Sequence, residues 1–200
     1  MTEAMAHSAT SQTRQGNGFV RTVLRTSATN FLVMAISTLT SIATARLFGV
    51  VGKGEFSAIL FWPTLLAGLV GFGLPTSLIY NLKQARGSGA DFVRVGFLFQ
   101  IPVSAIVGLV AWIWLPTWLG TYPADVVQTA RWYAALMLPV LLAINLVSAL
   151  AQSTGRFNLY NGVRLYVPLC NLAGLMALWA AGYADLRFAS LVFFATSVLV

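Results

Sequence analysis

The stretch VRVGFLFQIPVSAIVGLVAWIWLPTWL, residues 93–119, holds one charged residue, Arg94, and is otherwise dominated by aliphatic and aromatic side chains. A bilayer core about 30 Å thick is crossed by roughly 20 apolar residues in a helix, so this stretch predicts a transmembrane span. Four further stretches meet the length requirement: residues 27–48, 56–80, 132–152 and 164–183. A sixth and shorter apolar stretch, residues 188–200, would rise only about 20 Å as a helix.

The composition agrees with this pattern. Hydrophobic residues make up 58% of the chain, charged residues 8%, and the mean hydropathy is +0.80. We therefore predict an all-α integral membrane protein, with a disordered cytoplasmic tail over residues 1–20 and a six-helix transmembrane bundle over residues 21–200. Because the sixth span is short, we expect the chain to be a piece of a longer transporter. The alternative is a membrane scaffold or fragment without a substrate of its own.

The basic residues predict an orientation. With the N-terminus inside, eight of the twelve Lys and Arg residues flank inner segments, as the positive-inside rule favours. All six tryptophans then fall toward the outer leaflet, where their rings suit the interface. We expect a multi-pass protein of the plasma (inner) membrane with a cytoplasmic N-terminus. The first span also resembles a secretory signal ending Ala43-Thr44-Ala45, but it is longer than a typical signal core.

The positive charge does not indicate nucleic acid. The isoelectric point near 10.2 would be compatible with that partner, but the basic residues are spread over several loops with no basic module interleaved with aromatics. The partner we expect from this composition is membrane lipid.

Polar residues recur on one face of three spans. On the first span they fall within a stripe roughly 60° wide, which predicts either a hydrated cavity or a hydrogen-bonded helix contact. On the fourth and fifth spans the same two alternatives stay open. The polar residues are Asn30, Ser37, Ser41 and Thr44 on the first span, Asn145, Ser148 and Gln152 on the fourth, and Arg164 and Asn171, with Pro168 between them, on the fifth.

Two groups of cations are candidates for binding an anion. Arg46 lies at the outer end of the first span, where it either snorkels to the headgroups or faces a cavity. Lys83, Arg86 and Arg94 surround the inner mouth between the second and third spans, either as topology signals or as a phosphate site. We take Arg46, Arg86 and the first-span stripe as candidate substrate-binding residues.

Catalytic machinery is not visible in the sequence. The only histidine, His7, lies in the tail, so His-dependent catalysis and His-based metal sites are not expected. We predict a protein that is not an enzyme and that needs no cofactor. Glycines and prolines within the spans predict bent or broken helices, above all at Gly68, Gly71, Gly73 and Pro75 in the second span.

Three segments carry a resemblance to a known family. They are the turn after the first span, ARLFG at 45–49 followed by GKGEF at 52–56; the segment GFGLP at 71–75, with YNL at 80–82; and QSTGRF at 152–157, with Asn161 and Arg164. In order, they resemble the turn between helices one and two, the second helix, and the inner loop after helix four of the bacterial polysaccharide (O-antigen type) flippases. These flippases belong to the multidrug/oligosaccharidyl-lipid/polysaccharide exporter superfamily.

The resemblance implies two six-helix lobes that rock around a central cationic cavity. Such a protein carries an undecaprenyl-linked oligosaccharide from the cytoplasmic to the outer leaflet for polysaccharide export, and this chain would supply the first lobe. The sequence departs from related peptidoglycan-precursor flippases because it has no arginines around Met34, Thr40 or residues 65–68. The competing transport hypothesis, a cation-coupled multidrug exporter, requires a buried carboxylate that the spans lack.

Overall fold

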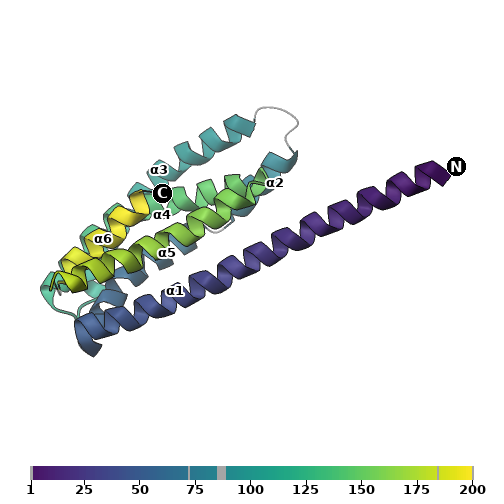
Figure 1. Cartoon of the computed structure of the whole chain (residues 1–200). Coiled ribbons are helices and arrows are strands. Elements are labelled where there is room, and N and C mark those ends of the chain that lie inside the picture. The colour runs from purple at the N-terminus through teal and green to yellow at the C-terminus, as the bar shows by residue number, and fades with distance from the viewer. Residues whose placement is uncertain (1, 72, 85–88, 184, 200) are drawn as a thin grey trace.

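The helices pack side by side as one bundle (Figure 1). The computed structural model describes the backbone of residues 2–71, 73–84, 89–183 and 185–199, and the side chains of these residues except 2–22, 74, 83, 89, 90 and 92. Within these residues the chain forms six helices and no strand, which confirms the predicted all-α fold. The helices are α1 (Thr2–Val70), α2 (Leu74–Gln84), α3 (Gly89–Trp118), α4 (Ala124–Ser153), α5 (Phe157–Ala180) and α6 (Leu186–Val198).

Length and hydropathy make the bundle a membrane domain. Four helical segments among the described residues are long and apolar enough to cross a bilayer, namely Val23–Val70, Val93–Trp118, Ala124–Ser153 and Phe157–Ala180. The chain is therefore a membrane-embedded helical protein. The sixth helix, α6, is 13 residues long and matches the short final span that the sequence predicts.

The first two predicted spans are joined at a single residue. Gly49 has φ 70° and ψ −172°, a conformation that essentially only glycine adopts, and it divides α1 into a first arm that ends at Phe48 and a second arm, residues 50–70. The sequence predicted a loop over residues 49–55, which is wrong, because the helix resumes directly after Gly49. The two arms turn back on one another at this point (Figure 1).

The predicted break in the second span is confirmed. The second arm ends at Val70, and α2 begins at Leu74 with Pro75 in its first turn. Gly73 between them has φ 84°, which a residue with a Cβ rarely adopts. The second span is thus two helices, as its glycines and proline indicated.

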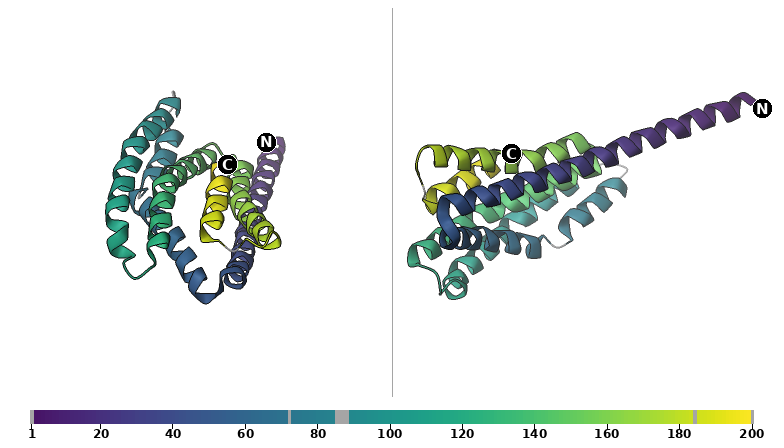
Figure 2. Two further views of the ribbon diagram at one scale, coloured as in Figure 1. Left: turned by 90° about the vertical axis from the view of Figure 1, so that its left-hand side faces the viewer. Right: turned by 60° about the horizontal axis from the view of Figure 1, so that its bottom comes forward.

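The first arm begins earlier than expected. Its backbone is helical from Thr2, whereas the sequence predicted a disordered tail over residues 1–20. The low apolar content of the tail favoured disorder, but its Ala, Met and Gln residues favour helix locally. The right-hand view of Figure 2 shows this end of the first arm extending past the other helices.

The central helix of the bundle is α4. Ten of its side chains are buried, among them Ala134 and Leu138, which are fully enclosed. Its main core cluster joins side chains of the second arm, α3 and α6, including Ile59, Leu115 and Ala189. The first arm reaches the bundle through α5, where Arg25 Nη1 donates to Asn158 Oδ1 at 2.6 Å. This arrangement leaves α4 and α5 flanking a space in the middle of the bundle.

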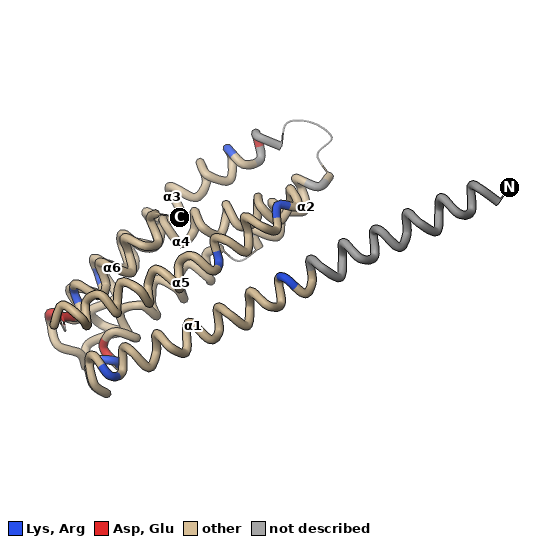
Figure 3. The backbone as a smooth tube through the Cα atoms, viewed as in Figure 1, with Lys and Arg blue, Asp and Glu red and all other residues tan. Residues whose placement is uncertain are grey.

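Charged and tryptophan residues gather near the helix ends. Figure 3 shows long stretches without charge between the two ends of the bundle. At the end that carries Gly49, Trp62 stacks on Trp118 with ring centroids 4.5 Å apart, and Trp112 meets Trp132 edge-on at 4.8 Å. Arg131 lies 4.4 Å over the Trp112 ring and donates from Nε to the Trp112 carbonyl at 2.9 Å. These four tryptophans, which the sequence assigned to one interface, therefore form two contacting pairs, which together make up the tryptophan cluster at this end of the bundle.

Candidate functional site

A cavity of about 550 Å³ lies between α4, α5 and α6 and extends to the second arm and α2. Its volume falls within the range of small-molecule sites, about 300–1,000 Å³. The described side chains that line it are both apolar and polar. Those on α5, and those on α4 other than Tyr133, come from the middle of the bundle and from the end opposite the tryptophan cluster.

The cavity is where the polar faces of α4 and α5 meet. Asn145, Ser148 and Gln152 on α4 recur at helical spacing and all line it. The opposite wall carries Arg164 and Asn171 of α5. The polar faces predicted for these two helices therefore line one common cavity, and its hydration stays a prediction.

Arg164 is the only charged residue among the described residues that line the cavity. Its Nη1 donates to Tyr160 Oη at 3.0 Å, and its guanidinium carbon lies 5.2 Å from the Tyr160 ring centroid. Tyr160 stands one helical turn before Arg164, so the two side chains share a face of α5. This contact holds the guanidinium in place and leaves further N–H donors for a ligand, since the group has five.

Two other features add hydrogen-bonding capacity to the wall. Pro168 lines the cavity and has no N–H to give to the carbonyl of Arg164, so that oxygen lacks its usual helical donor. Asn171 accepts a hydrogen bond through Oδ1 from the Thr196 hydroxyl of α6, which fixes its amide between the two helices. The wall thus offers a cation, amides and hydroxyls.

The predicted stripe of the first arm lies elsewhere. Asn30, Ser37 and Ser41 are exposed and Thr44 is buried, and none of the four is among the residues that line the cavity. Thr44 donates to the backbone carbonyls of Thr40 and Ser41, both at 2.9 Å. Such back-bonding satisfies the hydroxyl within its own helix, so a polar stripe does not by itself require a polar cavity.

The two predicted anion-binding arginines are also separate from the cavity. Arg46 is exposed near Gly49, at the tryptophan end of the bundle. Arg86 lies outside the described residues. A role for either arginine in binding substrate stays a prediction.

Sequence reasoning did not select Arg164 or Tyr160 as site residues. The signal for Arg164 was the polar face at 164, 168 and 171, and the signal for Tyr160 was its position one turn before the arginine. Within the described residues, no group of three or more His, Cys, Asp or Glu side chains is arranged to hold a metal ion.

Comparison of the chain with family models, with curated proteins and with solved structures found no match.

Proposed function

We propose that this chain forms a substrate-binding half of a membrane transporter that moves a lipid-linked, anionic oligosaccharide across the plasma membrane. The observation that carries this proposal is the cavity, where Arg164 is the one cation among the described lining residues and amides and hydroxyls surround it. A guanidinium suits phosphate because its planar donors match two oxygens of the anion. Amide and hydroxyl side chains suit sugar hydroxyls, since both donate and accept hydrogen bonds.

The charge balance favours an anionic substrate. None of the described residues that line the cavity is acidic, and a cation in a low-dielectric site attracts an anion more strongly than it would in water. A cation-coupled multidrug exporter would need a carboxylate there. The broken second span and the prolines within α3, α4 and α5 support a helix bundle that changes shape during transport.

In this proposal the chain binds and carries its substrate without chemical conversion, and a second lobe completes the path. The resemblance of residues 45–56, 71–82 and 152–164 to polysaccharide flippases suggests an undecaprenyl-linked saccharide and a cytoplasmic N-terminus. The excess of basic residues at the inner loops supports the same orientation. Binding by this half can be tested without the second lobe.

The test is binding of a fluorescent prenyl-pyrophosphate disaccharide to the purified chain in detergent. We expect Arg164→Gln to weaken binding at least about tenfold, as for loss of a charged hydrogen bond. Arg164→Lys, which keeps the charge without the fork, should be intermediate. The matched control is Arg156→Gln, because Arg156 is exposed just before α5 and does not line the cavity.

The neutral prenyl disaccharide without pyrophosphate completes the design. It should bind more weakly than the charged ligand and should be insensitive to Arg164→Gln. If Arg164→Gln and Arg156→Gln weaken binding of the charged ligand equally, the effect is general electrostatics and the cavity is not the site. If the wild-type chain binds neither ligand, the scaffold alternative gains support and the transport proposal is rejected.

A further inference from the structure

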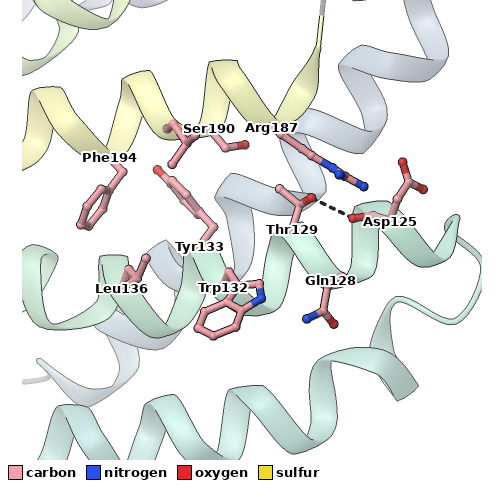
Figure 4. Close-up of a pocket in the computed structure, with 10 residues that line it drawn as sticks. Asp125, Gln128, Thr129, Trp132, Tyr133, Leu136, Arg187, Ser190 and Phe194 are labelled. Atoms are coloured by element: carbon pink, nitrogen blue, oxygen red, sulfur yellow. Dashed lines mark hydrogen bonds between the residues drawn. The ribbon is translucent and has the colours of Figure 1, made fainter.

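A second pocket, of about 340 Å³, lies between α4 and α6 at the tryptophan end of the bundle. It is distinct from the cavity of Arg164, with which it shares only Tyr133. Figure 4 shows Asp125 of α4 and Arg187 of α6 at one end of this pocket. Trp132, Leu136 and Phe194 extend along its length away from the two charged side chains (Figure 4).

The polar character of the pocket is concentrated at its charged end. The Gln128 amide and the hydroxyls of Thr129, Tyr133 and Ser190 also line it. Thr129 donates to the carbonyl of Asp125 and Ser190 donates to the carbonyl of Leu186, both at 2.8 Å. These hydroxyl protons are therefore used within their own helices. Asp125 and Arg187 remain as the charged groups that a ligand would meet.

The length of the pocket suits an amphiphile. From Asp125 to Leu136 α4 rises about 16 Å, so a ligand with its polar group at the charged end would run along apolar side chains toward the middle of the bundle. Trp132, Leu136 and Leu191 are 56%, 46% and 57% exposed, so this wall faces outward, where lipid surrounds a membrane protein. Tryptophan at this depth is typical of the membrane interface.

The position of Arg187 points to a bound anion. It lies in the first turn of α6, where the helix dipole favours negative charge and disfavours a cation. Asp185 caps the same helix by accepting from the Arg187 backbone N–H at 2.8 Å. Asp125 in the first turn of α4 obeys the dipole rule and would attract a cation. The pocket mouth therefore matches a headgroup that carries both signs.

We propose that this pocket binds one phospholipid with a zwitterionic, primary-amine headgroup, that is, a phosphatidylethanolamine. The phosphate pairs with the guanidinium of Arg187, and the ammonium pairs with the carboxylate of Asp125. One acyl chain lies along Trp132, Leu136 and Phe194. A phosphatidylglycerol lacks the ammonium and would leave the carboxylate facing an anion, so the site discriminates against it. The proposal does not depend on the transport function proposed above.

The experiment measures retention of lipid by the full chain with native mass spectrometry after exchange into detergent containing equal amounts of phosphatidylethanolamine and phosphatidylglycerol. We expect the wild type to retain phosphatidylethanolamine preferentially. Asp125→Asn and Arg187→Gln should each lower its affinity about threefold to fivefold, the range for a partly exposed ion pair. Glu55→Gln is the control, because Glu55 is an acid at the same end that does not line the pocket.

A wild-type measurement keeps the test decisive where a variant folds poorly. A phosphatidylethanolamine with a photoreactive acyl chain should cross-link to α4 and α6 in the neighbourhood of Trp132, Leu136 and Phe194. Equal retention of the two lipids by the wild type, cross-links confined to other helices, or an equal loss in the Glu55→Gln control would each overturn the proposal.

Discussion

Arg25 Nη1 of the first arm donates a hydrogen bond of 2.6 Å to Asn158 Oδ1 of α5, 133 residues further along the chain. One turn along α5, Asn161 Nδ2 donates to Thr26 Oγ1 at 3.4 Å. Two consecutive residues of the first arm thus contact the same face of α5. These contacts lie near the end of the bundle opposite the tryptophan cluster and join the arm to the wall of the cavity.

The Arg25–Asn158 contact should measurably couple the first arm to α5. A double-mutant cycle with Arg25→Gln and Asn158→Ala should give a coupling free energy of about 0.5–1 kcal/mol, because the pair is exposed and water competes for it. The measurement is the free energy of unfolding in mixed micelles. Additive effects of the two substitutions would mean that the contact contributes nothing to stability.

Gly49 should tolerate substitution poorly although it has open space around it. A Cβ built there meets no atom within 4 Å, so the cost of Gly49→Ala is backbone strain alone, about 1–3 kcal/mol. Gly54→Ala is the control, since a Cβ at Gly54 also meets nothing within 4 Å and its backbone is helical. That control should be neutral or stabilising. A Gly49→Ala protein as stable as the wild type would show that the two arms meet in another conformation.

Much of the fold can be predicted from the sequence because hydropathy and helix-breaking residues are local signals. The lengths of the apolar stretches predicted the spans, and Gly71, Gly73 and Pro75 predicted the break in the second span. The loop predicted at residues 49–55 was wrong, because the positive φ of Gly49 alone turns the chain and the helix resumes at once. The number of residues needed to turn the chain depends on backbone geometry rather than on composition.

The site was less predictable, and the first arm shows why. A polar stripe reports which residues share a face, but which face meets a cavity depends on the helices packed beside it. Thr44 satisfies its hydroxyl within α1, whereas Asn171 needs Thr196 of α6. The hydrogen bond from Thr196 to Asn171 joins residues of two different helices, so the periodicity within one helix does not predict it.

Close packing of α5 against α6 should depend on Gly174. A Cβ built at this glycine would collide with the Val192 side chain of α6. Gly174→Leu should therefore force the helices apart and lower the free energy of unfolding by about 1–3 kcal/mol. Gly162→Leu, on an exposed part of α5 where a Cβ meets nothing within 4 Å, is the matched control.

Compensation distinguishes collision from a general effect of glycine replacement. This test uses the smaller change Gly174→Ala, whose new Cβ would strike a methyl group that Val192→Ala removes. The variant that carries both Gly174→Ala and Val192→Ala should therefore be more stable than the sum of the two single changes predicts. Strict additivity, or equal damage from Gly162→Leu, would contradict the contact between these two helices.

Water should reach the cavity wall on α4 but not the exposed apolar surface of α3. We expect single cysteines at Ser148 and Gln152 to react with a small, membrane-impermeant thiol reagent in protein reconstituted in bilayers. Their side chains line the polar cavity, which water can enter because amides and hydroxyls are there to bind it. The native thiol, Cys170, is partly buried in α5 and is replaced by alanine beforehand.

The control cysteine at Leu109 of α3 separates hydration from simple exposure. Leu109 is 62% exposed, far more than Ser148, yet it belongs to the apolar surface that lipid covers, so its thiol should stay unreacted and protonated in hydrocarbon. A cysteine at Ser37 on the predicted stripe provides a further comparison, because that residue is exposed but lies apart from the cavity. Reaction at Ser148 and Gln152 with protection at Leu109 and Ser37 would assign the aqueous path to the α4–α5 face. Reaction at Ser37 alone would assign the aqueous path to the first arm, and the cavity of Arg164 would then be a packing gap closed to water.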